Sequence, residues 1–125
     1  MKILLVDDSR TMRNIWKRVV SGFDDSEILE AGDGQEGLKT ISENGPVDLI
    51  LLDWNMPNMD GLAMLKKVRE NDKTTPVIMV TTEAEKLRII DAIKAGANNY
   101  VVKPFTPDAL KSKIDETLKK ASQPA

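Results

Sequence analysis

The sequence predicts an α/β fold in which a doubly wound parallel sheet of five strands is covered by helices on both faces. Five short apolar runs alternate along the chain with segments of helical spacing, and they cover residues 3–6, 28–29, 49–52, 77–80 and 100–102. The third and fourth runs are continuously apolar, which is typical of strands buried on both faces. Regular alternation of strands and helices favours parallel pairing, because each helix carries the chain back across the sheet.

Apolar spacing and capping residues indicate where the helices lie. Ser9 is a suitable N-cap for the first helix, whose apolar residues recur at intervals of three and four: Met12, Ile15, Trp16, Val19, Val20 and Phe23. Thr106 followed by Pro107 favours a helix start, and Gly96 favours a helix end. The later helices are predicted over residues 35–43, 62–70, 83–95 and 107–120.

Length and composition limit the classes of function. With 125 residues, 41% of them hydrophobic, the chain is long enough for one domain, which we expect over 1–121 with a tail over 122–125. The chain has no His and no Cys, which excludes Ser-His-Asp and Cys-His nucleophiles, zinc fingers and disulfides. A net charge of -2 argues against nucleic-acid binding. Neither a membrane-spanning run nor a signal-peptide pattern is present. We expect a cytoplasmic monomer.

Polar residues end the predicted strands. Asp7 and Asp8 follow the first strand, Asp53 the third, Thr81 the fourth and Lys103 the fifth. In parallel α/β sheets, ligands bind beyond the carboxyl ends of the strands. We therefore expect three carboxylates, a hydroxyl and an ammonium to converge on one edge of the sheet.

Some of these residues have a purely structural explanation when taken singly. Asp8 and Thr81 could cap helices, and Lys103 could be a solvated loop residue. Asp53 is harder to explain in this way, because a charge after four buried apolar residues is costly unless it is paired or metal-bound. Clustered carboxylates need a cation, and a donor set made only of oxygen suits Mg²⁺. Without His or Cys the best nucleophile is a carboxylate, so Asp53 is the natural phosphoryl acceptor.

These residues resemble the receiver domain of two-component response regulators, over essentially the whole chain. The resemblance implies a flavodoxin-like (βα)5 fold with strand order 2-1-3-4-5. It implies that Asp53 takes a phosphoryl group from a partner histidine kinase, and that Thr81 and Lys103 bind the phosphoryl oxygens. It also implies a cis Lys103-Pro104 bond and a Mg²⁺ site whose ligands are Asp7, Asp8, Asp53 and the backbone carbonyl of Asn55.

Within that family, the stretches 53–61 and 100–106, with Glu83 two residues after Thr81, resemble single-domain chemotaxis regulators. This implies a kinase of the chemotaxis type and a phosphorylated form that binds the flagellar motor switch protein to control rotation. Tyr100 would turn inward on activation. The positions implied to contact the motor switch are Lys86, Ile89, Tyr100, Val102 and Lys113. Thr82 departs from the Ala that is common beside the switch Thr, so turnover rates do not carry over.

The helix predicted over 83–95 independently suggests a partner surface. Its apolar residues Leu87, Ile89, Ile90 and Ile93 cover too wide an arc to all face the sheet, so some are expected to be exposed. The alternative is that these apolar residues form a wide buried face that packs on the core. Lys119 and Lys120 are expected only to complement the dipole of the last helix.

Other functions match the sequence less well. A haloacid-dehalogenase-like phosphatase would have Asp-x-Asp after the first strand and a cap domain, and a nucleotide-binding module would have a glycine-rich turn there. The expected protein is not an enzyme, since it would carry out only its own phosphotransfer and dephosphorylation. A stand-alone receiver in a phosphorelay, or one with a non-motor output, remains an alternative, and the need for a separate phosphatase is open.

Overall fold

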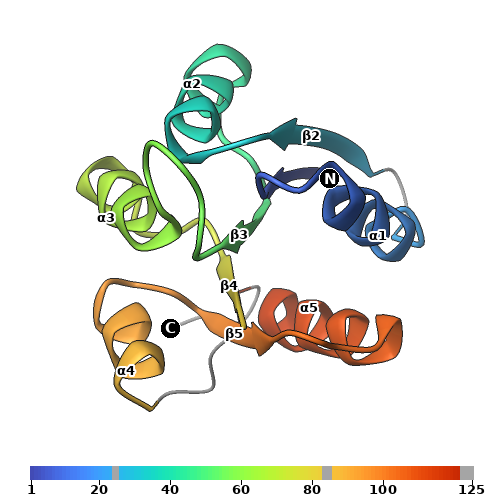
Figure 1. Ribbon diagram of the computed structural model, residues 1–125. Helices are drawn as coiled ribbons and strands as arrows, with labels where there is room; N and C mark the ends of the chain where they lie inside the picture. The colour runs from blue at the N-terminus through green and yellow to red at the C-terminus, as the bar shows by residue number, and fades with distance from the viewer. Residues whose placement is uncertain (24–25, 83–85, 122–125) are drawn as a thin grey trace.

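The computed structural model describes residues 1–23, 26–82 and 86–121, which form five strands and five helices in strict alternation (Figure 1). The strands are β1 (Lys2–Val6), β2 (Glu27–Ala31), β3 (Leu49–Asp53), β4 (Val77–Thr81) and β5 (Asn99–Val102). The helices are α1 (Arg10–Val20), α2 (Gly34–Asn44), α3 (Gly61–Asn71), α4 (Lys86–Lys94) and α5 (Pro107–Ala121). No helix within these ranges is long and apolar enough to cross a membrane. The expected tail, 122–125, lies outside the described residues.

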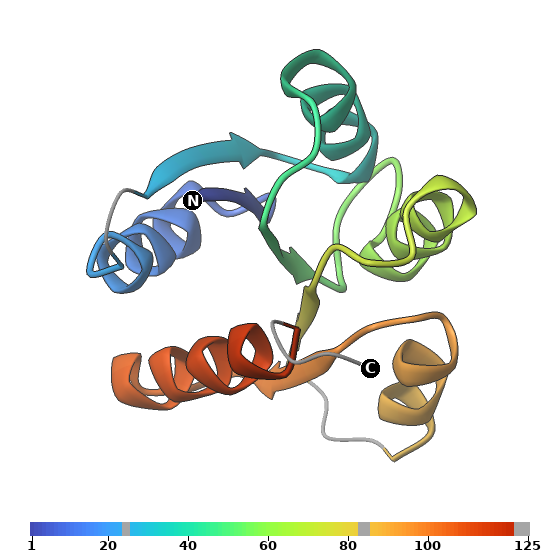
Figure 2. The same cartoon turned by 180° about the vertical axis from the view of Figure 1, so that it is seen from behind.

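The five strands form one parallel sheet in the order β2-β1-β3-β4-β5, as predicted. Helices α1 and α5 cover one face, and α2, α3 and α4 cover the other (Figures 1 and 2). Alternate residues of each central strand enter the two core layers: Leu49 and Leu51 pack on the α1/α5 side, Ile50 and Leu52 on the opposite side. This two-sided burial explains the continuous apolar runs of β3 and β4.

Capping residues set the helix ends where the sequence predicts them. The Ser9 hydroxyl accepts a hydrogen bond from the amide of Met12 at 3.2 Å, and the Thr106 hydroxyl accepts one from Ala109 at 3.1 Å. Gly96 follows α4 with a φ of 108°, a left-handed conformation that glycine adopts without strain. Ser9, and not Asp8, therefore caps α1.

The structure differs from the predicted elements by more than one residue in three places. Strand β2 covers five residues, where only 28–29 was predicted, because this edge strand is partly solvated and carries polar residues such as Glu30. Helix α1 ends at Val20, so Phe23 lies beyond it, and Ile15 is 37% exposed. The described part of the fourth helix begins at Lys86, and the predicted start over 83–85 lies outside the described residues.

Arg69 on α3 connects the loops at the amino-terminal edge of the sheet. Its guanidinium donates hydrogen bonds to the backbone carbonyl of Gly96, at 3.0 and 2.9 Å, and to that of Thr75 at 2.8 Å. It also donates to the carbonyl of Asp72 and the side-chain oxygen of Asn98, both at 3.0 Å. One side chain thereby joins the chain before β4 to the chain before β5, at the edge opposite the polar residues that end the strands.

Asp72 organises the turn that leads into β4. Its carboxylate accepts hydrogen bonds from the amides of Thr74 and Thr75, at 2.9 and 3.0 Å, and from both threonine hydroxyls. Burial opposes ionisation, but these hydrogen bonds, led by that of the Thr75 hydroxyl, outweigh it and lower the pKa of Asp72 to about 2.

We expect Asp72→Asn to lower the free energy of unfolding at pH 7 by about 1 kcal/mol, the usual worth of a charged side chain that caps backbone amides. Because the folded pKa lies below the unfolded one, the stabilisation is complete above about pH 4 and is lost as the pH falls toward 2. Urea unfolding of both proteins between pH 7 and 2.5 measures the difference. A difference that does not change over this range would contradict the assignment.

Candidate functional site

The structure brings the predicted polar residues together at the carboxyl edge of the sheet. Asp53 and Thr81 are the last residues of β3 and β4, while Asp7 and Lys103 directly follow β1 and β5. Asp7, Asp53 and Thr81 are at most 5% exposed, whereas Asp8 is exposed. One carboxylate oxygen from each of the three aspartates lies within 4.8 Å of the others. Parallel strands therefore gather the acids as the sequence predicts.

Lys103 joins the two buried carboxylates. Its ammonium lies 3.3 Å from Asp7 Oδ2 and 3.1 Å from Asp53 Oδ1, and its side chain is only 15% exposed. The solvated-loop explanation of Lys103 is therefore wrong. The backbone supports this position, because the amide of Lys103 donates a hydrogen bond to the carbonyl of Thr81 at 2.7 Å. The Lys103-Pro104 bond is cis, as expected from the resemblance.

Burial shifts the pKa of both acids. Burial raises the pKa of Asp53, the neighbouring charge of Asp7 raises it further, and Lys103 only partly offsets both, which leaves the pKa at about 6. Burial also raises the pKa of Asp7, against the opposing effects of the Ser9 amide and Lys103. One ammonium thus compensates the negative charge of this edge incompletely.

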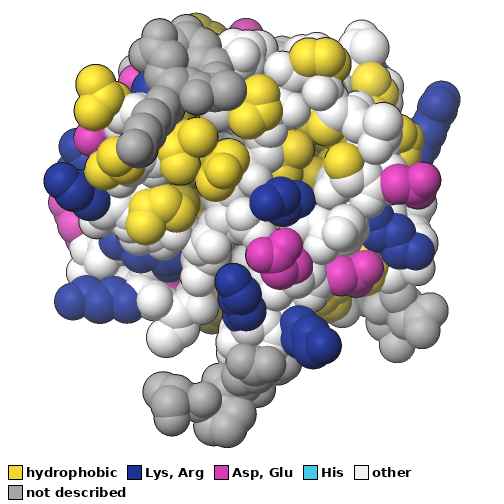
Figure 3. Space-filling view, turned by 90° about the horizontal axis from the view of Figure 1, so that it is seen from below, with side chains coloured by type: hydrophobic (Ala, Val, Ile, Leu, Met, Phe, Trp, Pro, Cys, Tyr) yellow, Lys and Arg dark blue, Asp and Glu magenta, His cyan; other side chains and the backbone are white. Residues whose placement is uncertain are grey.

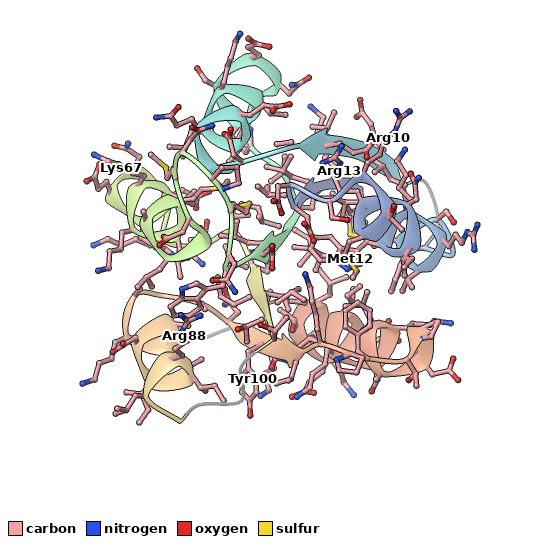
Figure 4. All side chains as sticks on the ribbon, viewed as in Figure 1. Arg10, Met12, Arg13, Lys67, Arg88 and Tyr100 are labelled. Atoms are coloured by element: carbon pink, nitrogen blue, oxygen red, sulfur yellow. The ribbon has the colours of Figure 1, made fainter. Side chains whose placement is uncertain are left out.

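Helix α1 and strand β2 hold Asp7 in place. The amide of Ser9 donates to Asp7 Oδ1 at 2.8 Å, and Arg13 donates to the Asp7 backbone carbonyl. Arg13 also pairs with Glu30 of β2 at 3.0 Å, and Lys17 pairs with the second oxygen of Glu30 at 2.8 Å. Figure 4 shows Arg13 in this position, between α1 and β2. Asp7 therefore rests on a network of contacts that spans α1 and β2.

The loop after β3 closes tightly against Asp53. The amide of Trp54 donates to the carbonyl of Val80 at 3.0 Å, and the amide of Gly61 donates to the carbonyl of Trp54 at 2.9 Å. A Cβ at Gly61 would lie 2.2 Å from the carbonyl oxygen of Asp53, so only glycine fits there. Asn55, whose carbonyl the resemblance makes a metal ligand, is exposed in this loop.

A positively charged side chain of α4 packs on the residue next to Asp53. The guanidinium of Arg88 lies over the Trp54 ring, 5.0 Å from its centroid, and Trp54 is only 7% exposed. Figure 4 shows Arg88 extending from α4 toward the loop after β3. The fourth helix therefore contacts the immediate neighbour of the buried carboxylate.

The predicted partner residues occupy the end of the molecule formed by α4, β5 and α5. Tyr100, Val102 and Lys113 line one groove of about 420 Å³, and the Lys113 ammonium lies 5.3 Å from the Tyr100 ring centroid. Ile89 is half-buried on α4, and Lys86 is the first described residue of that helix.

The expectation of exposed apolar residues on α4 is confirmed. Leu87 is 74% exposed, Ile93 is 48% exposed and Ile90 is 36% exposed. Figure 3 shows the resulting cluster of hydrophobic side chains on the α4 side of this end of the molecule. A surface of this kind is typical of a site that binds another protein.

Comparison of the chain with known protein families agrees with the fold and the site. A family model described as the response regulator receiver domain matches residues 3–115. The chain belongs to this family.

Known relatives of this receiver domain include chemotaxis proteins. A chemotaxis protein CheY homolog of Campylobacter jejuni is 48% identical over 120 residues, which cover 94% of this chain and 92% of that protein. Chemotaxis protein CheY1 of Helicobacter pylori is also 48% identical, over 94% of this chain and 97% of that protein. A CheY-like receiver domain structure from Methanospirillum hungatei superposes with a TM-score of 0.86 at 33% identity, covering 96% of this chain and 94% of that one.

The acidic cluster of the receiver domain fits Mg²⁺. Asp7, Asp8 and Asp53 offer only oxygen donors, which is the ligand type that Mg²⁺ prefers. Burial raises the pKa of Asp7 and Asp53 even with Lys103 beside them, so a bound cation would favour their ionised forms. Asp8 is exposed, so one side of the cluster remains open to the waters that Mg²⁺ usually retains.

Sequence reasoning missed three side chains that support the site. Arg13, Arg88 and Trp16 contact the Asp7 backbone, Trp54 and Lys103 respectively. Trp16 was predicted only as part of the apolar stripe of the first helix. Its spacing is identical to that of a core residue, so no sequence signal distinguishes it. Arg13 and Arg88 lie on helices among other charged residues, which hides them equally well.

We expect Asp53→Asn to raise the free energy of unfolding of metal-free protein at pH 8 by about 2 kcal/mol. The folded pKa of Asp53 lies above its unfolded value, so ionisation destabilises the fold progressively between about pH 4 and 6 and fully above that window. The gain should therefore disappear near pH 4. Urea unfolding in the presence of a chelator measures this gain in stability. An unchanged or lower stability of Asp53→Asn at pH 8 would contradict the conclusion that ionised Asp53 destabilises the fold.

Proposed function

We propose that this receiver domain is a phosphorylation-activated response regulator in which Asp53 accepts a phosphoryl group from a histidine kinase. The observation that carries the proposal is the position of Asp53, a buried carboxylate at the carboxyl edge of the sheet with the Lys103 ammonium at 3.1 Å. The raised pKa of about 6 still leaves Asp53 mostly ionised at pH 7, so it is available as a nucleophile.

Transfer of the phosphoryl group to Asp53 needs no other acid, base or nucleophile from this chain. An Asp53 carboxylate oxygen attacks the phosphorus of a phosphohistidine, the O–P bond forms and the P–N bond breaks. The histidine nitrogen leaves with the electron pair and takes up a proton from solvent. Hydrolysis returns the protein to its unphosphorylated form. Water attacks the phosphorus, and the bond between the Asp53 oxygen and phosphorus breaks. The products are inorganic phosphate and the free carboxylate.

Each polar residue of the edge then has a role. Asp7 and Asp8, with Asp53 and the carbonyl of Asn55, would hold Mg²⁺. When bound, Mg²⁺ supplies positive charge that stabilises the phosphoryl oxygens. Lys103 transfers its hydrogen bond from the carboxylate to a phosphoryl oxygen, and Thr81, at the end of β4, donates its hydroxyl to another.

The activity turns over no external substrate, so the protein is not an enzyme in the usual sense. Its partners would be a kinase of the chemotaxis type and an output protein, in the cytoplasm, with the receiver as a monomer. The output proposed is the flagellar motor switch protein, since the relatives are chemotaxis proteins. The alternative is a role in a phosphorelay or a non-motor output. Binding of a motor-switch peptide distinguishes the motor output from this alternative.

The surface formed by α4, β5 and α5 would carry the signal. Thr81 ends β4 in register with Val102 of β5, two residues after Tyr100, so an inward movement of its hydroxyl changes the space beside β5. Tyr100 would then turn inward and leave its contact with Lys113. A partner that binds this conformer and a phosphoryl group that favours it stabilise each other.

The first test adds Mg²⁺ and a small phosphodonor such as acetyl phosphate. We expect a mass gain of one phosphoryl group and a change in tryptophan fluorescence, both absent in Asp53→Asn. Asp8→Ala should weaken the Mg²⁺ dependence, because it removes one charged ligand. Trp54→Phe is the matched control, since it retains the phosphoryl acceptor and should abolish most of the fluorescence change but not the mass gain. A wild-type protein that gains no mass would refute the mechanism.

The second test measures binding of a motor-switch peptide by titration calorimetry, with and without phosphorylation. We expect phosphorylation to increase the affinity about tenfold, which corresponds to an ordinary coupling free energy. Lys113→Ala should reduce the affinity of the phosphorylated form, whereas Lys39→Ala, an exposed lysine on α2, should not. Equal affinity in both states would exclude the motor output. Rapid phosphoryl transfer to a histidine phosphotransfer domain would then favour the phosphorelay.

A further inference from the structure

A buried tryptophan contacts the lysine of the site from the core side. Trp16 of α1 is 0% exposed, and the Lys103 ammonium lies over its ring at 5.8 Å from the centroid. The same ammonium lies 3.1 Å from Asp53 and 3.3 Å from Asp7. Lys103 therefore has the two carboxylates and an aromatic face around its charged end.

We propose that Trp16 is a positioning residue that holds the Lys103 ammonium at the carboxyl edge of the sheet, ready to bind the phosphoryl group on Asp53. The inference rests on the proposed function and extends it to a residue outside the polar cluster. Trp16 acts in this proposal through its contact with the Lys103 ammonium.

Packing alone does not account for an indole at this position. The indole Nε1 of Trp16 is buried and finds no hydrogen-bond partner among the described residues. The other buried side chains of its core cluster are hydrocarbon, among them Leu5, Leu51 and Val101. A buried donor without a partner costs free energy, which a leucine or phenylalanine would avoid. The electron-rich indole face offers the ammonium a cation–π contact, which compensates for this cost.

The flexibility of lysine explains why such a contact is useful. A lysine side chain has a long stem with many rotamers, and its ammonium is strongly hydrated. The carboxylates hold the ammonium before phosphorylation, but the bond to Asp53 must be exchanged for one to a phosphoryl oxygen when the acceptor is modified. The contact with Trp16 involves no atom that reacts, so it persists through this exchange. It thereby limits the conformational entropy that Lys103 loses on binding the phosphoryl group.

The experiment measures two affinities on the full chain with Trp16→Leu, Trp16→Phe and the wild type. Beryllofluoride, a stable analogue of the phosphoryl group, is titrated at saturating Mg²⁺, and Mg²⁺ is titrated alone. We expect Trp16→Leu to weaken beryllofluoride binding about tenfold, as a desolvated cation–π contact would. The affinity for Mg²⁺ should change less than twofold, because Lys103 is not a metal ligand. Trp16→Phe keeps an aromatic face and should recover most of the affinity.

Two controls separate positioning from a general loss of packing. Val20→Ala removes buried volume from the same helix and the same core cluster, and should leave both affinities unchanged. In a Lys103→Met background, Trp16→Leu should cause no further loss of beryllofluoride affinity, because the group through which it acts is gone. An equal loss in both backgrounds, or wild-type affinity in Trp16→Leu, would overturn the proposal.

An NMR measurement tests the contact independently of phosphorylation. The ring current of Trp16 should shift the ε-methylene protons of Lys103 upfield in the free wild-type protein, less so in Trp16→Phe. Lack of this shift in the wild type would overturn the proposal even if Trp16→Leu does not fold. If the shift is present but the wild type binds no beryllofluoride and gains no phosphoryl group, the proposed function fails while the placement of Lys103 by Trp16 stands.

Discussion

The Lys103 ammonium lies between the buried carboxylates of Asp7 and Asp53, and the chemistry of the site depends on this three-way contact. Two buried carboxylates so close together repel each other, and one ammonium compensates only part of their charge. Burial raises the pKa of each acid, and the charge of Asp7 raises that of Asp53 further, so both remain raised despite this ammonium. An edge with this imbalance is suited to a hard divalent cation and, once the cation is bound, to an anionic phosphoryl group.

The sheet provides this contact because it is parallel throughout. Parallel pairing aligns the carboxyl ends of β1, β3, β4 and β5, so residues far apart in sequence meet at one edge. The opposite edge has its own connection, in which Arg69 joins the chain before β4 to that before β5. Polar side chains thus connect the segments at both edges, while two apolar core layers pack on the faces of the sheet between them.

Two aromatic contacts link the buried acids to the helices around them. Trp54, next to Asp53, is covered by Arg88 of α4, and Lys103 is backed by Trp16 of α1. The exposed apolar residues of α4 lie on the same helix as Arg88, so one helix carries both this surface and the residue that contacts Trp54 beside Asp53. A shift of α4 would change the contact between Arg88 and Trp54, so this contact physically links the exposed surface of α4 to the site.

The order of elements, the parallel sheet and the polar residues at the strand ends could be predicted from the sequence, because two-sided burial and capping leave a periodic pattern in a single chain. The sequence also predicted that some of Leu87, Ile89, Ile90 and Ile93 are exposed, since together they cover too wide an arc for one buried face, and three of them are exposed. The groups that surround Lys103 and Trp54 could not be predicted in this way. Trp16 and Arg88 lie on helices that are remote in sequence from the residues they contact. The spacing of an apolar or charged residue on a helix does not show which residue its side chain will contact. Contacts of this kind depend on how helices pack across the sheet, which local spacing does not record.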